Sequence, residues 1–415
     1  MAAPEINWLF VDLNSYFASI EQELRPELRG QPIGIVPVVA DSTCCIAASY
    51  QAKAYGIKTG TSVADAKTLC PHLLVVEARP RLYVEYHHRI AAAIERCVPI
   101  QQVMSCDEFA CKLLGRERDL VRATGIAYAI KQELRGVGIT LRCSIGLAPN
   151  RLLAKIAGET QKPDGLMIFE RRNLPRALYI LNIADIPGIG TQMEARLRSA
   201  GIDTMRQLCA QPRERLHHLW GGVLGDRLWL WLRGEDFLEP PTKPLQTLSR
   251  QHILAPNCRN PDRSLGVAIK LLHSTARRMR RNQLWAGGIS LHIGFYGAST
   301  YDAAIRIPPC NDPFTLQDHL LALWSNSPTH TPSEIGVTLT HLDIEPSPDL
   351  FGLTPDPRQR ITPAIDTLNA RYGLNTVYLG SIHNVRKEAP TRIPFGPPPP
   401  LEEFDDTADK QRKKR

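Results

Sequence analysis

The sequence contains two adjacent carboxylates, Asp107 and Glu108, which could together bind a metal ion. They lie between the apolar stretches 103–104 and 110–114, which predict two short strands joined by a bend. Neighbouring side chains of a regular strand point to opposite faces, so the two carboxylates can serve one site only where the backbone turns. Carboxylate oxygens at such a turn favour a hard divalent cation such as Mg²⁺. A solvated turn that binds no metal is the alternative interpretation.

Asp12 is a third carboxylate in a position suited to chemistry. It directly follows residues 6–11, which are apolar except at Asn7 and predict a buried strand. We expect Asn14 or Ser15 to cap the helix that comes next. An acid between a buried strand and a helix N-terminus is well placed to take part in metal or anion binding. Helix capping is the alternative role for Asp12.

The segment FVDLNSYFASIE around Asp12 and the segment SCDE around Asp107 and Glu108 resemble the two metal-binding motifs of the Y-family translesion DNA polymerases. This is the group of DNA polymerase IV and UmuC, and the resemblance covers residues 6–345. It implies that the three carboxylates are catalytic. It also implies that they hold two Mg²⁺ ions, together with the backbone carbonyl of Leu13, for attack of the primer 3′-hydroxyl on the incoming dNTP.

Further residues are implied to contact the nucleotide. Residues 47–58 predict a helix, on which Tyr50 and Lys53 are three positions apart and share a face. The resemblance implies that both hold the triphosphate, and that Lys162 does so from the family's A-K-x-A…K-P signature. It also implies that Phe17 stacks near the sugar and excludes a 2′-hydroxyl. The alternative interpretations are core packing for the aromatic residues and a solvated position for Lys53.

Length and composition limit the classes of protein that fit. A chain of 415 residues predicts several domains. A net charge of +8 suits a polyanionic partner, although it does not separate nucleic acid from an acidic membrane surface. No apolar run reaches membrane-spanning length and no signal peptide is evident, so we expect no membrane association and a cytoplasmic location. The ten cysteines show no zinc-ligand spacing.

The order of predicted elements gives the domain organisation. Strands alternate with helices over residues 1–168, which predicts an α/β palm with fingers inserted at about 18–78. A Pro-Gly-Ile-Gly turn between helices predicts a helix-hairpin-helix thumb over 169–236. Its Gly188 and Gly190 would let backbone N–H groups approach a DNA phosphate.

The remaining segments complete the prediction. A proline-rich linker at 237–247 precedes residues 248–345, which predict a β-sheet with two helices, as in the family's little finger. The predicted fold class is therefore α+β multidomain. Its shape is a right-hand polymerase with an α/β palm, small fingers, a helical helix-hairpin-helix thumb, and a little finger of a β-sheet plus two helices.

The helix predicted over 263–283 carries a basic stripe of Lys270, Arg277 and Arg281. A stripe of this kind is usually a solvated face, but the resemblance implies that it follows template phosphates. Residues 346–415 form a C-terminal tail in which Leu350 and Phe351 resemble a sliding-clamp-binding peptide. The compositions of residues 395–400 and 410–415 predict disorder.

The sequence is thus interpreted as a monomeric, template-directed DNA polymerase of the lesion-bypass type, acting in DNA repair on primer-template DNA and dNTPs. A polymerase-like accessory protein without catalysis is one alternative, and the three carboxylates argue against it because a scaffold does not need them. A nucleotide cyclase is another. The helix-hairpin-helix and the basic C-terminal region argue against a cyclase, which does not bind duplex DNA.

Overall fold

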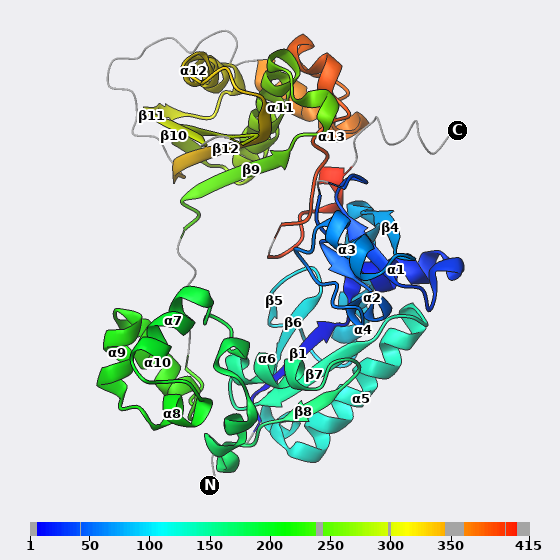
Figure 1. The fold of residues 1–415 in the computed structure, drawn as a ribbon, viewed down its shortest axis with the longest axis vertical. Helices are drawn as coiled ribbons and strands as arrows, with labels where there is room; N and C mark the ends of the chain where they lie inside the picture. The colour runs from blue at the N-terminus through cyan, green and yellow to red at the C-terminus, as the bar shows by residue number, and fades with distance from the viewer. Residues whose placement is uncertain are drawn as a thin grey trace. The chain divides into compact units, whose positions relative to one another are not determined.

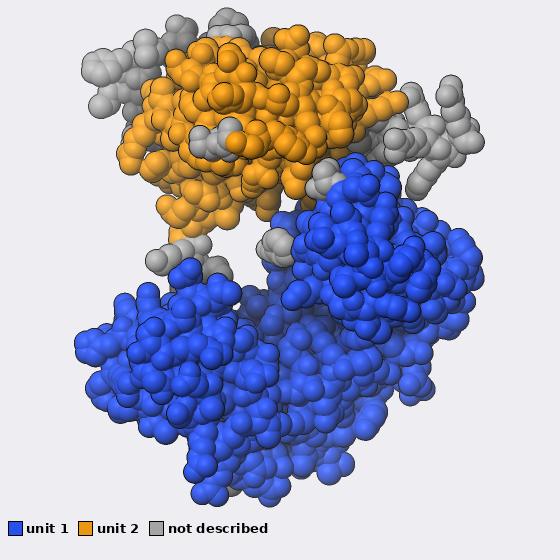
Figure 2. All heavy atoms as spheres, viewed as in Figure 1, with its two compact units in different colours: residues 1–239, 393–399 blue, residues 240–392, 400–415 orange. Residues whose placement is uncertain are grey.

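The computed structural model describes residues 6–41, 43–237, 244–297, 300–344, 361–394 and 396–404. The chain divides into two compact units (Figures 1 and 2). Unit 1 comprises residues 1–239 and 393–399, and unit 2 comprises residues 240–392 and 400–415. None of the helices in these described ranges is long and apolar enough to cross a membrane.

A five-stranded sheet forms the centre of unit 1. Its strand order is β5 (Gln102–Val103), β6 (Glu108–Lys112), β1 (Trp8–Leu13), β7 (Cys143–Ala148) and β8 (Leu166–Ile168). The strand predicted at 6–11 begins and ends later, as β1. Every residue of β7 is buried. A central strand with helices on both faces has no solvent side.

Helices cover both faces of this sheet. The helices α4 (Pro80–Glu95) and α5 (Leu120–Val137) pack against each other, and their apolar side chains share a core with Leu9 and Val11 of β1 (Figure 1). Phe10 belongs to a second core, with side chains of α6 (Arg151–Thr160). Because side chains alternate along a strand, Asp12 lies on the α6 face with Phe10.

A smaller sheet of β3 (Ala47–Ala48), β2 (Ile33–Val36) and β4 (Leu74–Glu77) has its own apolar core. The helices α1 (Tyr16–Leu24), α2 (Tyr50–Lys53) and α3 (Val63–Leu69) belong to the same part of the chain. The helix predicted over 47–58 is therefore only partly correct. Ala47 and Ala48 pair with β2, so the helix starts after the Ser49 cap.

Residues 191–231 form four short helices, α7 (Thr191–Ser199), α8 (Met205–Ala210), α9 (Arg213–Trp220) and α10 (Val223–Trp231). Their apolar faces meet in one core that includes Ile189, Leu197 and Leu216. A 3₁₀ turn, Ile183–Asp185, stands before the Pro-Gly-Ile-Gly turn where we predicted an α-helix.

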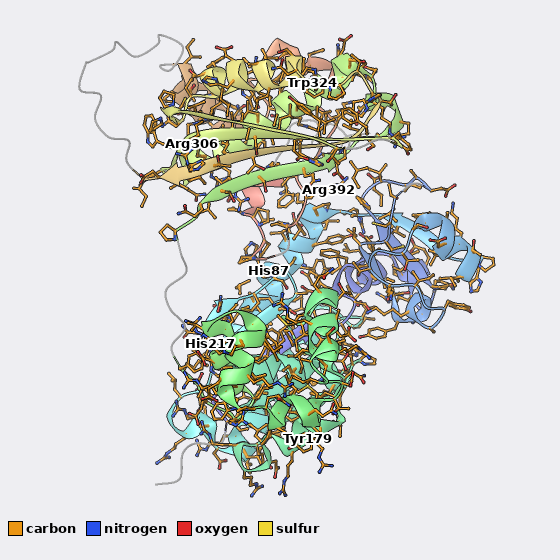
Figure 3. All side chains as sticks on the ribbon, turned by 60° about the vertical axis from the view of Figure 1, so that its left-hand side comes forward. His87, Tyr179, His217, Arg306, Trp324 and Arg392 are labelled. Carbon is orange, nitrogen blue, oxygen red and sulfur yellow. The ribbon has the colours of Figure 1, made fainter. Side chains whose placement is uncertain are left out.

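Unit 2 is built on a four-stranded antiparallel sheet. The order is β11 (Tyr301–Cys310), β10 (Trp285–Phe295), β12 (Pro332–Asp343) and β9 (Thr247–Ile253). The helices α11 (Pro261–Arg281) and α12 (Pro313–Ser325) pack on it. Figure 3 labels Trp324 in this helix layer and Arg306 on β11. The predicted α+β class, with a sheet and two helices in this part, is confirmed.

The C-terminal segment belongs to unit 2 except at residues 393–399. It contains α13 (Ile361–Tyr372) and 3₁₀ turns at Gly380–Val385 and Leu401–Phe404. Ile382 and Val385 enter the core of the unit. Phe404, which follows the first stretch predicted to be disordered, is buried, and the second stretch, 410–415, lies outside the described residues. Leu350 and Phe351, the predicted clamp-binding residues, lie outside the described residues.

Candidate active site

Asp12 and Glu108 are direct partners across the β1–β6 ladder. The pairing is antiparallel, so the two side chains lie on the same face of the sheet. The predicted bend follows β5 and precedes β6, and the backbone N–H of Leu13 donates to the carbonyl oxygen of Asp107 at 2.9 Å. The structure thus brings together the two motifs that the sequence places about a hundred residues apart.

Helix α6 approaches this face closely enough to add side chains to the site. A Cβ on Gly146 of β7 would lie 1.9 Å from the carbonyl oxygen of Ala154, so only glycine allows α6 to pack at this distance. The Asn150 side chain caps the helix by accepting from the N–H of Leu153 at 2.9 Å.

Glu159 is the site residue that the sequence analysis missed. Oxygen atoms of Asp12, Glu108 and Glu159 all lie within 4.8 Å of one another. Three carboxylates at this separation are a donor set that fits a hard divalent cation. The available signal was the position of Glu159, four residues after Lys155 and three before Lys162, inside the signature segment.

Asp107 does not join this cluster of carboxylates. Its Oδ1 accepts a hydrogen bond from the Ser105 hydroxyl at 2.6 Å. The bend is held by the buried His87 of α4, labelled in Figure 3, whose Nδ1 lies 2.7 Å from the carbonyl oxygen of Cys106. The His87 ring also stacks on Phe109, with ring centres 5.0 Å apart. His87 therefore positions the bend.

Two lysines neutralise part of the acidic cluster. The Nζ of Lys162 lies 2.8 Å from a carboxylate oxygen of Asp12 and 2.8 Å from one of Glu159. Lys155 forms an ion pair with Glu108. Burial raises the pKa of Asp12 and Lys162 lowers it, while the charge of Glu159 raises it further, to about 8 overall. Burial lowers the pKa of Lys162, but Asp12 and Glu159 outweigh that effect and raise it.

The predicted nucleotide-binding residues lie near the same charges. The Nζ of Lys53 sits 4.6 Å from the centre of the Tyr50 ring, so the two share a face as predicted. Burial lowers the pKa of Lys53, and the charge of Lys162 lowers it further. Phe17 is half-buried and stacks on Tyr83, with ring centres 4.5 Å apart.

Ser15 occupies the N-cap position of α1, which is one of the two predicted caps. It is in the left-handed region with φ 48°, and its side chain makes no capping hydrogen bond. The Asn14 amide instead donates to the Ser144 hydroxyl at 3.1 Å, and its oxygen accepts from the backbone N–H of Asp164 at 2.7 Å. These bonds tie the loop that carries Lys162 to the end of β1.

Comparison with known proteins agrees with this arrangement. Residues 11–159 match the impB/mucB/samB family, residues 184–236 the DNA polymerase-iota thumb domain, and residues 245–350 the impB/mucB/samB family C-terminal domain. DNA polymerase IV of Moorella thermoacetica is 37% identical over 287 residues, which cover 68% of this chain and 71% of that protein. The chain belongs to the Y family of DNA polymerases.

This Y-family polymerase also aligns with a relative over most of its length and resembles a solved polymerase structure. DNA polymerase IV of Bacillus velezensis is 27% identical over 395 residues, covering 91% of this chain and 93% of the relative. A Y-family DNA polymerase chimera of Dbh and Dpo4 matches with a TM-score of 0.69 at 24% identity, covering 81% of this chain and 99% of the chimera. The family assignment makes the chain a DNA-directed DNA polymerase.

The two predicted DNA-contacting glycines of the Y-family polymerase lie at an exposed turn before α7. Gly188 has φ 93°, which favours glycine. A Cβ on Gly188 or Gly190 would meet no atom within 4 Å. The backbone at this turn is therefore open to a ligand, and its contact with DNA stays a prediction.

The predicted basic stripe on α11 needs a correction. Lys270 is buried, and its Nζ donates to the carbonyl oxygens of Arg386 at 2.6 Å and Glu388 at 2.5 Å. Arg277 is half-buried and lines a cavity, whereas Arg281 is exposed and lies 3.7 Å from a carboxylate oxygen of Glu403. Residues 386–388 cover Lys270, so Lys270 is not part of a solvent-exposed stripe, and phosphate contact by Arg281 stays a prediction.

Proposed function

We propose that this polymerase copies damaged template DNA in repair synthesis by adding dNMP units to a primer 3′-hydroxyl at the acidic cluster. The observation that carries the proposal is the approach of Asp12, Glu108 and Glu159 to within 4.8 Å beside the lysine ammonium groups. An accessory protein without catalysis would gain nothing from the buried Asp12 and the half-buried Glu108, whose charges are costly to desolvate.

The carboxylates would hold Mg²⁺. Asp12, Glu108 and Glu159 supply the clustered oxygens, Asp107 supplies another carboxylate at the bend, and the carbonyl of Leu13 is the backbone ligand proposed from the family motif. Bound Mg²⁺, two ions in our proposal, would lower the pKa of the primer hydroxyl and offset phosphate charge. The chain itself fixes these ligands on β1, β6 and α6, so little reorganisation is needed when the metal binds.

The cationic side chains would bind the triphosphate of the dNTP. Lys162 and Lys53 present ammonium groups, and Tyr50 presents a hydroxyl beside Lys53. A lysine supplies a compact charge that offsets the negative charge developing on the departing pyrophosphate. Phe17 would lie against the sugar and leave no room for a 2′-hydroxyl.

Contacts with DNA and with a clamp complete the proposal. The turn at Gly188 and Gly190 would bind a backbone phosphate of primer-template DNA without reading sequence. Of the arginines predicted as phosphate contacts, Arg277 lines a cavity of unit 2, and the exposed Arg281 stays a proposed contact. Leu350 and Phe351 would dock the polymerase, as a monomer, on a sliding clamp.

Primer extension tests the proposal. The wild-type protein should extend a primer with Mg²⁺ and stop in EDTA, and a panel of templates with defined lesions should reveal which damage it passes. In Asp107→Ala the rate of primer extension should fall at least about 10³-fold. Its affinity for duplex DNA should change little, because most contacts with DNA phosphates lie elsewhere. Glu95→Gln, which removes an exposed carboxylate of α4, is the control. Near-normal extension by Asp107→Ala would overturn the metal assignment, and DNA binding without extension by the wild type would favour the accessory protein.

A further inference from the structure

Unit 2 contains a cavity that the polymerase chemistry does not use. Its volume is about 50 Å³, and it lies between α11, α12 and residues 362–382. A water molecule needs roughly 10–15 Å³ on the same measure, so the cavity has room for an ion the size of phosphate. The wall includes His273, Arg277, Arg280, Phe314, Asp366 and Tyr378. It belongs to the helix layer, in which Figure 3 labels Trp324, and not to the sheet.

The two arginines in the wall differ in their partners. Arg280 makes a bidentate ion pair with Asp366, with distances of 2.7 and 2.9 Å. The guanidinium of Arg277 makes no hydrogen bond or ion pair within the part of the chain that the structure describes. A guanidinium taken out of water without a partner loses hydration that nothing replaces.

The nearby carboxylates are already engaged. Glu403 pairs with Arg250 at 2.8 Å and lies 3.7 Å from Arg281. Burial is the main cause that lowers the pKa of Arg277, and with the charge of Arg250 it brings the pKa to about 10 although Glu403 and Asp366 raise it. Because Glu403 pairs with Arg250 and Asp366 pairs with Arg280, the charge of Arg277 is left unbalanced among the described residues. An anion in the cavity would remove this imbalance.

We propose that this cavity is a binding site for a small oxyanion of the phosphate class, with Arg277 as its principal ligand. The guanidinium fork matches two oxygens of a phosphate, and a charge-assisted pair of this geometry is among the stronger polar contacts. The bound ion would connect α11 to α13, because both helices form the wall. Its role is to fasten the C-terminal segment to the core of unit 2.

Hydrogen–deuterium exchange on the full-length protein tests the site. Peptides covering residues 361–382 should exchange more slowly in phosphate than in chloride of equal ionic strength. At ten times the dissociation constant, exchange through local opening should slow about tenfold. The local readout matters because phosphate can also bind at the active site of unit 1 and can stabilise proteins by exclusion from their surfaces. A parallel measurement with dCMP shows whether the phosphate of a nucleotide is accepted as well as the free ion.

Variants of two neighbouring arginines, Arg277 and Arg278, test whether phosphate binds in the cavity. Arg277→Met should abolish the protection by phosphate, and in phosphate-free buffer it should be as stable as the wild type or more so, because an unpaired charge is removed. Arg278→Met removes the same charge from the next position of α11, outside the cavity wall, and should retain the response. Arg277→Lys keeps the positive charge but loses the guanidinium fork, and it should weaken phosphate binding about tenfold. This variant tests the proposal if the methionine variant does not fold. Protection that is absent in the wild type, or undiminished in both Arg277 variants, would overturn the proposal.

Discussion

Lys162 places its ammonium nitrogen 2.8 Å from a carboxylate oxygen of Asp12. The same lysine is the proposed ligand of the dNTP triphosphate. A divalent cation and this ammonium group therefore compete for Asp12. We expect metal binding to release Lys162 toward the nucleotide phosphates, so that the two binding events favour each other.

Glu159→Gln should weaken divalent-cation binding in the absence of nucleotide. It removes one of three clustered carboxylates, and we expect Mn²⁺ affinity, measured by electron paramagnetic resonance, to fall about tenfold. Glu159→Asp keeps the charge and should retain most of the affinity. Unchanged Mn²⁺ binding by the glutamine variant would show that Glu159 only holds Lys162.

Phe17→Ala should admit ribonucleotides, because removal of the ring opens the space beside the sugar. The ratio of kcat/KM for dNTP and rNTP incorporation measures the effect, and we expect discrimination to fall at least about tenfold. The ring also stacks on Tyr83, so thermal unfolding should be followed in parallel. Ile20→Ala, a buried residue one turn further along α1, controls for loss of packing. If both variants keep their discrimination, Phe17 is a core residue.

Lys270→Met should destabilise unit 2 without changing DNA affinity. The substitution leaves the carbonyl oxygens of Arg386 and Glu388 without their donor, at a cost of about 2–3 kcal/mol. Limited proteolysis should cut residues 361–404 faster. Arg259→Met, which removes an equal charge elsewhere in unit 2, is the control. A reduced salt dependence of DNA binding in Lys270→Met, with normal stability, would restore Lys270 as a phosphate contact.

Unit 2 should lose stability in mild acid through His252. Burial, together with the charges of Arg392 and Lys270, lowers the pKa of His252 to about 4. Between pH 6.5 and pH 4 the unfolded chain binds a proton that the folded unit does not, so the free energy of unfolding falls as pH falls through this range. The loss is on the order of 2 kcal/mol.

Urea unfolding measured at several pH values checks this sign. His252→Gln cannot titrate and should flatten the pH dependence, whereas His330→Gln, at an exposed position, should leave it unchanged. A slope that is the same in all three proteins would assign the acid sensitivity to other groups.

Replacement of both Leu350 and Phe351 by alanine should remove stimulation by a sliding clamp while unaided extension stays normal. Each large apolar side chain contributes roughly 1.5–3 kcal/mol when it is buried in a partner, which is enough to decide micromolar binding. Primer extension with and without the clamp measures the difference. Equal stimulation of the double variant and the wild type would show that these residues belong to a linker.

Several features could be predicted because they are encoded locally. The strand–bend–strand around Asp107, the cap of α6 at Asn150 and the apolar stripe of α11 follow from side-chain periodicity and from capping chemistry. The carboxylates, the lysines and the family to which they belong were evident from residue types and their order. These features depend only on residues close together in the chain.

Other features depend on which distant segments meet, and only the tertiary structure decided them. Asp12 opposes Glu108 because β1 and β6 pair in one register, and Glu159 joins them because Gly146 lets α6 pack closely. Lys270 has the spacing of a solvated stripe, yet residues 386–388 cover it and accept its hydrogen bonds. Local periodicity predicts which face of a helix a side chain occupies. The packing of distant segments decides which residues lie against that face.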